Sequence, residues 1–212
     1  MHPGQKAACG AIVMRYFLYL AVLLLMTCVP AAADTGAAIT DIKVVPLTQE
    51  ITPIPSMTSD GRDGKIIKAW RENGNAQAYN LFLVTADGKV VGVATDRGFA
   101  DNIRDEPHTG KDAVESIRFA WGRVGGEKAF LLITATRIIA PDYGPGDPSQ
   151  VIFDIYQLTG NGDLGKTGDF FMRIHEFNAD KKYCNSDLAL TKNLGLPLPQ
   201  PFEGPNQDDG CL

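Results

Sequence analysis

Hydrophobic and polar residues alternate along the middle of this chain with the period of two that is typical of β-strands. The runs are short, rich in aliphatic and aromatic residues, and separated by glycine-containing turns, of which Asp87-Gly88 is typical of a tight hairpin. The strands predicted in this way cover residues 66–70, 79–85, 89–95, 130–139, 151–158 and 170–177. The pattern therefore predicts a mainly β fold.

The predicted strands form two groups that look alike. Each group has a glycine-rich hairpin, then a strand that ends near an arginine (Arg71 or Arg137), then a strand with a central phenylalanine (Phe82 or Phe153). An internal duplication would produce this likeness, and so would two separate β-meanders. We expect two similar antiparallel β subdomains, meander- or sandwich-like. The expected boundaries are 34–96 and 113–195 for the subdomains, 97–112 for a polar linker, and 196–212 for a Pro-rich tail.

One short C-terminal helix is expected over 186–194. Asn185 or Ser186 supplies the N-cap, Asp187 lies in the first turn, and Gly195 ends the helix before Pro197. Helix signals are weak elsewhere, so this helix is the one exception in a β chain.

The N-terminus has a different pattern, with an apolar run from Phe17 to Met26 after a single Arg15 and small residues up to Ala33. This design is typical of a secretory signal peptide covering residues 1–33, cleaved after Ala33, with Met14 as the favoured start. A retained anchor helix and a lipoprotein acylated at Cys28 are the alternatives. Export predicts a periplasmic or secreted protein.

Cysteine usage agrees with export. After cleavage only Cys184 and Cys211 remain, and two cysteines in an oxidising compartment most simply form a disulfide. This bond would hold the Pro-rich tail against the body of the protein. No metal or other cofactor is expected, because neither cysteine has a second cysteine or a histidine at ligand spacing.

Charge excludes one class of partner. The whole chain has a net charge of −5, and loss of the leader removes basic residues and no acid. Because phosphate backbones require a basic protein face, nucleic acid is not an expected partner.

Two motifs suggest ligands that we do not expect. Residues 160–167 match the phosphate-loop pattern of nucleotide hydrolases, but the residues that follow alternate like a strand, whereas that loop requires a helix. A hairpin turn is predicted instead, with no nucleotide. The acidic stretches 60–63 and 161–163 lack the closing Glu of a calcium loop and are predicted to be turns.

Catalytic signatures are also weak, so the protein is not expected to be an enzyme. The chain has no Gly-x-Ser-x-Gly elbow and no Ser-x-x-Lys motif. A hidden hydrolase triad would have to use His108 or His175, and the candidate combination is His175 with Asp154 or Glu176.

The richest candidate binding surface is the polar stretch 70–79. Arg71 offers a planar fork for a carboxylate, Asn73 and Asn75 offer amide groups, and Tyr79 together with Trp70 offers apolar walls. A second loop would add Arg137, Asp142 and Tyr143. The structural alternative is that both arginines pair with acidic neighbours and the aromatic residues fill the core.

These segments resemble a known family. Residues 71–79 (RENGNAQAY), 151–158 (VIFDIYQL) and 181–185 (KKYCN) are similar to motifs of the carbapenem intrinsic-resistance proteins of the CarG type. Gln77 stands where the family motif has His, and Glu115 or a neighbour stands near where the family has a second cysteine. The resemblance implies a periplasmic β protein of two similar subdomains that protects against a β-lactam without hydrolysing it.

Two functions remain open from the sequence. The first is a non-catalytic protein that binds or shields against a small anionic ligand such as a β-lactam. The second is an envelope module that supports structure or binds another envelope protein. The oligomeric state is left open.

Overall fold

The computed structural model describes residues 37–73, 77–107, 112–144, 146–160, 168–202, 204–205 and 209–211. Residues Gly36–Leu212 form one compact unit. The predicted signal peptide, Met14 and Cys28 lie outside the described residues, so they remain predictions.

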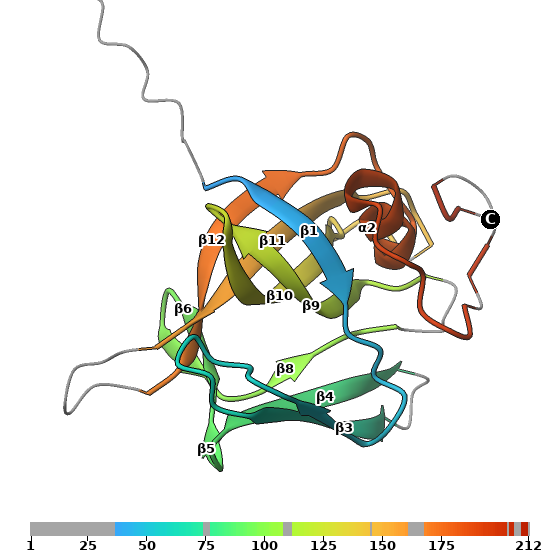
Figure 1. The fold of residues 1–212 in the computed structure, drawn as a ribbon. Helices are drawn as coiled ribbons and strands as arrows, with labels where there is room; N and C mark the ends of the chain where they lie inside the picture. Colours follow the sequence, from blue (N-terminus) through green and yellow to red (C-terminus); the bar gives the residue numbers. More distant parts are fainter. Residues whose placement is uncertain are drawn as a thin grey trace, which may run out of the picture. The chain divides into compact units, whose positions relative to one another are not determined.

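The fold is mainly β, as the alternating pattern predicts, and most strand pairs are antiparallel. A seven-stranded sheet has the order β1-β9-β10-β11-β12-β6-β7, in which β12 and β6 are parallel (Figure 1). Its strands are β1 (Ile39–Val44), β6 (Gly92–Thr95), β7 (Gly98–Ala100), β9 (Glu115–Val124), β10 (Glu127–Ile138), β11 (Gln150–Thr159) and β12 (Phe170–Asn178).

A second sheet has five strands in the order β2-β3-β4-β5, with β8 paired to β4. Its strands are β2 (Ile51–Ile54), β3 (Gly64–Asn73), β4 (Gln77–Ala86), β5 (Lys89–Val90) and β8 (Ile103–Arg104). Strands from both halves of the chain meet in the seven-stranded sheet, because β1, β6 and β7 pair into it. The proposed duplication and the subdomain boundaries remain predictions.

Two hairpins show why the local sequence folds in this way. Asp87 and Gly88 connect β4 to β5 with φ of 51° and 75°, and Gly125 and Gly126 connect β9 to β10 with φ of 59° and 88°. Two consecutive residues with positive φ match the right-handed twist of the flanking strands. The Asp87-Gly88 hairpin is thereby confirmed.

Strand β9 was not predicted from the sequence. Arg118 and Arg123 interrupt its apolar residues, which weakens the strand signal. In the structure, Arg118 forms an ion pair with Asp187 of the helix at 2.7 Å, and both side chains are nearly buried. Asp187, which compensates the nearly buried charge of Arg118, lies 69 residues away in sequence.

The expected helix is present as α2 (Ser186–Leu194). Asn185 is its N-cap and accepts hydrogen bonds from the backbone N–H groups of Asp187 and Leu188, and Gly195 ends the helix in the left-handed conformation. Among the described residues, no helix is long and apolar enough to cross a membrane.

Two hydrophobic clusters hold these elements together. The first lies between the two sheets and includes Phe82 and Val84 of β4 together with Phe119, Phe130 and Phe171 of the larger sheet. The second lies between the other face of the seven-stranded sheet and α2 (Figure 1). The five-stranded sheet thus packs one face inward, and its opposite face belongs to neither cluster.

Candidate functional site

Two of the sequence-predicted site residues meet on the five-stranded sheet. Arg71 of β3 lies directly opposite Tyr79 of β4 in the strand register. The guanidinium carbon of Arg71 lies 5.7 Å from the centre of the Tyr79 ring. Antiparallel pairing of adjacent strands therefore brings together two residues that the sequence placed at the ends of one polar stretch.

A third residue, Arg104 of β8, completes the cluster. Arg104 pairs with Leu81 on the other side of β4, and its guanidinium carbon lies 5.9 Å from the Tyr79 ring. One Nη of Arg104 also forms an ion pair with Glu106 at 2.9 Å. We call Arg71, Tyr79 and Arg104 the arginine–tyrosine cluster. Sequence reasoning missed Arg104 because it lies in the polar segment that was expected to be a linker.

This cluster has the chemistry of an anion site. Each cation–π contact contributes about 0.5–1 kcal/mol at an exposed position and orients a guanidinium beside the ring. A planar guanidinium can then donate two parallel hydrogen bonds to a carboxylate, while the ring offers a flat apolar surface to the ligand body. The arrangement is therefore suited to binding an anion that has an apolar body.

Asn73 and Asn75 cannot be assigned to the cluster from the structure. The backbone of Asn73 pairs with Gln77 at the end of the β3–β4 hairpin. Asn75 lies outside the described residues. Their predicted role in binding therefore stays a prediction.

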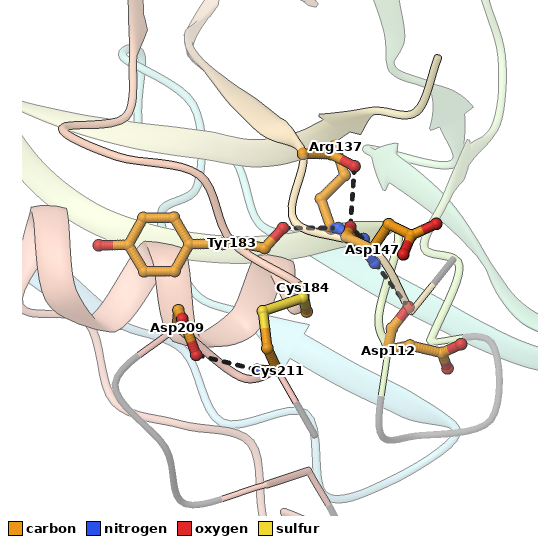
Figure 2. Close-up of a disulfide and its surroundings, with 8 residues drawn as sticks. Asp112, Arg137, Asp147, Tyr183, Cys184, Asp209 and Cys211 are labelled. Atoms are coloured by element: carbon orange, nitrogen blue, oxygen red, sulfur yellow. Dashed lines mark hydrogen bonds between the residues drawn. A yellow bond between two sulfur atoms is a disulfide. The ribbon is translucent and has the colours of Figure 1, made fainter. Parts of the chain in front are cut away.

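Arg137 lies in a different place, on the face of β10 that packs toward α2. Its side chain is buried (2 % exposed) and donates to three main-chain oxygens. Nε donates to Tyr183 (3.1 Å), Nη1 to Asp112 (3.2 Å) and Nη2 to Asp147 (2.7 Å) (Figure 2). Burial lowers the pKa of Arg137, and the charges of Asp112 and Asp147 oppose this effect. These contacts give Arg137 a structural role.

Tyr143 of the same loop region is exposed, and its backbone N–H donates to the carbonyl oxygen of Ala140. No contact among the described residues joins Tyr143 to the arginine–tyrosine cluster. The six predicted binding residues therefore do not form one group in the described part of the chain.

A pocket of ≈ 440 Å³ lies on the seven-stranded sheet. It is lined by Ala94, Thr95, Asp96, Tyr156, Met172 and Arg173. Arg173 is already paired with Asp154 (3.2 Å) and with Glu176. Because two carboxylates neutralise its only lining cation, this pocket is less suited to an anion than the arginine–tyrosine cluster is.

Strands β11 and β12 separate the three residues that the sequence offered for a hydrolase triad. His175 pairs with Ile155, whereas Asp154 pairs with Glu176. Because consecutive residues of a strand point to opposite faces, His175 and these two carboxylates lie on different faces of the sheet. His175 stacks on Phe177 instead, with ring centres 5.2 Å apart.

Carboxyl groups gather where β8 ends and β9 begins. Glu106 and Glu115 form an antiparallel bridge, in which the main-chain N–H of Glu106 donates to the main-chain carbonyl oxygen of Glu115 at 2.8 Å. Burial, with the charge of Glu106 as the next cause, raises the pKa of Glu115 to about 7. Burial likewise raises the pKa of Asp105, although hydrogen bonds from Asn80 oppose this. No cluster of potential metal ligands is found among the described residues.

The acidic and glycine-rich stretches have turn geometry where they are described. Asp60 binds Arg62 (2.8 Å) and Asp63 accepts a hydrogen bond from the Ser56 N–H. Residues 161–167 of the phosphate-loop match lie outside the described residues. The element that follows them is strand β12, as the sequence predicts, and not a helix.

The disulfide expected between Cys184 and Cys211 is present. Cys184 and Cys211 are joined at 2.05 Å. Two hydrogen bonds hold the tail at the same point. The Cys184 N–H donates to the main-chain oxygen of Asp209 (2.8 Å), and the Asp209 side-chain Oδ1 accepts from the Cys211 N–H (Figure 2). A disulfide fits a protein of an oxidising compartment.

Comparison with solved structures connects this arrangement to a known fold. The chain superposes on the crystal structure of CarG with a TM-score of 0.55, over 71% of this chain and 94% of that one. The fold resembles that of CarG. Sequence identity to CarG is 16%, so the likeness lies in the fold. No protein-family model matches the chain, and no curated protein sequence matches it.

Proposed function

We propose that this chain is an exported, non-catalytic protein that binds a small anionic ligand, with a β-lactam of the carbapenem class as the first candidate. The carrying observation is the arginine–tyrosine cluster, in which Arg71 and Arg104 both lie within 6 Å of the Tyr79 ring centre. The CarG-like fold and the three sequence motifs support the choice of ligand class.

The ligand carboxylate would accept hydrogen bonds from Arg71, whose guanidinium forms no ion pair among the described residues. Arg104 would add positive charge from the other side of Tyr79. Its ion pair with Glu106 occupies some of the N–H donors of Arg104, and the others can face the ligand. The ligand body would lie on the tyrosine ring. Binding of this kind shields a drug from its target and leaves its bonds intact.

Thermal shift with meropenem tests this proposal on disulfide-intact protein. The wild type should melt at a higher temperature with the drug, an esterified carbapenem should have a smaller effect, and the supernatant should contain unchanged drug. Arg71→Ala should weaken binding about tenfold, in line with the loss of a charge-assisted hydrogen bond.

Arg123→Ala is a matched control for Arg104→Ala, because the side chains of Arg104 and Arg123 are 56% and 55% exposed. The control should bind like the wild type, and Arg104→Ala should not. Hydrolysis of the drug would contradict a non-catalytic role. An equal loss of binding in Arg123→Ala, or no shift in the wild type, would contradict the site.

A second candidate function, an envelope interaction module, is favoured by one further observation. The face of the five-stranded sheet that carries the arginine–tyrosine cluster also carries Ile67, Leu81 and Leu83, which belong to neither hydrophobic cluster.

A further inference from the structure

Strand β4 is apolar on both of its faces. Its inward residues Phe82 and Val84 belong to the cluster between the sheets. Its outward positions include Tyr79, Leu81 and Leu83, where a one-sided antiparallel sheet would have polar residues, and the polar Thr85 continues the same row. Strands that are apolar on both faces are typical of sheets that are covered on both faces.

The strand register extends this apolar surface across three strands. Ile51, Ile67 and Leu83 form one row, and Ala69 and Leu81 form the next. None of these residues belongs to either hydrophobic cluster, and Ile51 is 51% exposed. In Figure 1, β3, β4 and β5 lie at the lower margin of the drawn fold. We call this surface the outer face.

The charges on the outer face differ from those of the chain as a whole. Its register positions include Lys65, Arg71 and Arg104. Glu106, two residues beyond Arg104, is held in the ion pair with that arginine. The chain as a whole has a net charge of −5. An apolar surface bordered by cations is complementary to a partner that is both apolar and anionic.

Size decides between the partners that meet this description. Strands lie about 4.8 Å apart and rise about 3.4 Å per residue, so the outer face covers about 400 Å². A stable protein interface buries about 800 Å² on each side. A second copy of the chain would also bring the same three cations against each other. A lipid surface needs only a few inserted apolar side chains and a ring of cations.

We propose that the outer face docks on an anionic lipid surface. Ile51, Ile67 and Leu83 contact the boundary between headgroups and acyl chains, and Lys65, Arg71 and Arg104 contact lipid phosphates. Tyr79 has the amphipathic ring that is favoured at this depth. The docking surface shares Arg71, Tyr79 and Arg104 with the proposed small-ligand site. Its aliphatic rows and Lys65 lie outside that site, so variants of Ile51 and Lys65 test the docking surface separately.

Sedimentation with lipid vesicles tests the docking surface on the disulfide-intact protein. The wild type should bind vesicles of phosphatidylcholine with 30% phosphatidylglycerol and remain in the supernatant with pure phosphatidylcholine. Binding should fall sharply in 0.5 M salt, because the charges are exposed. Ile51→Ser and Lys65→Glu should each reduce vesicle affinity about tenfold or more.

Two matched variants separate the outer face from general surface effects. Ile138 is also 51% exposed but lies on the seven-stranded sheet, so Ile138→Ser should bind vesicles like the wild type. Lys182 is exposed beside the disulfide, so Lys182→Glu should also be neutral. Unchanged melting temperatures would show that all four variants are folded.

Three outcomes would overturn the proposal. The first is no sedimentation with anionic vesicles. The second is an equal loss in the Ile138→Ser or Lys182→Glu variants. The third is equally tight binding to soluble polyglutamate, which would assign the outer face to an acidic protein. Meropenem binding should be unaffected by Ile51→Ser, so failure of the docking surface and failure of the proposed function give different results.

Discussion

Arg137 donates its Nε–H to the main-chain oxygen of Tyr183 at 3.1 Å, across 46 residues of sequence. The same guanidinium binds the main-chain oxygens of Asp112 and Asp147. One side chain therefore connects β10 to the segments before β9, before β11 and after β12. The tail disulfide begins at Cys184, the residue that follows Tyr183.

Arg137→Lys should lower the free energy of unfolding by about 2–4 kcal/mol, because an ammonium group cannot reach three carbonyl oxygens at once and leaves buried acceptors unpaired. Urea unfolding followed by circular dichroism measures this. Arg123→Lys, on the surface, should change stability by less than about 0.5 kcal/mol. Normal stability with weakened meropenem binding would instead assign Arg137 to a ligand site.

Glu115→Gln should make the protein more stable at high pH relative to the wild type. Burial, followed by the charge of Glu106, raises the pKa of Glu115 to about 7 from 4.5. Arg104 lowers this pKa, and Asp105 and Asp154 raise it further. The native state then binds more protons than the unfolded state between about pH 4.5 and 7, so wild-type stability falls as pH rises through this window.

The loss should amount to about 2–3 kcal/mol across the window, at about 1.4 kcal/mol per pKa unit. Melting temperatures of the wild type and of Glu115→Gln, measured from pH 4.5 to 8, should diverge as pH rises. Glu127→Gln, at an exposed position on β10, should follow the wild type. Parallel curves for the wild type and Glu115→Gln would contradict a raised pKa.

Replacing both Cys184 and Cys211 with serine should destabilise the protein by about 3–4 kcal/mol, because the disulfide restricts a loop of 27 residues in the unfolded chain. Unfolding in urea, with and without a reductant, measures this. The reductant should shift the wild type to the midpoint of the double variant and leave the double variant unchanged. A wild type that is insensitive to complete reduction would contradict this expectation.

Two residues of the candidate site, Arg71 and Tyr79, could be named from the sequence. Both were placed in the polar stretch 70–79, and local pairing of β3 with β4 is enough to bring them together. Arg104 could not be foreseen, because β8 has two residues and forms only by pairing with β4. The three main-chain acceptors of Arg137 could not be foreseen either, because they are distant in sequence, and its role in ligand binding stays a prediction.

The sequence by itself determined the β class, the C-terminal helix with its caps, and the pairing of Cys184 with Cys211, because these depend on local periodicity, turn chemistry and residue counts. Only the tertiary structure decided which strands share a sheet, which arginine is buried and which face of β4 stays outside the core. These outcomes depend on packing and ion pairs between segments far apart in the chain, and local patterns carry no information about them.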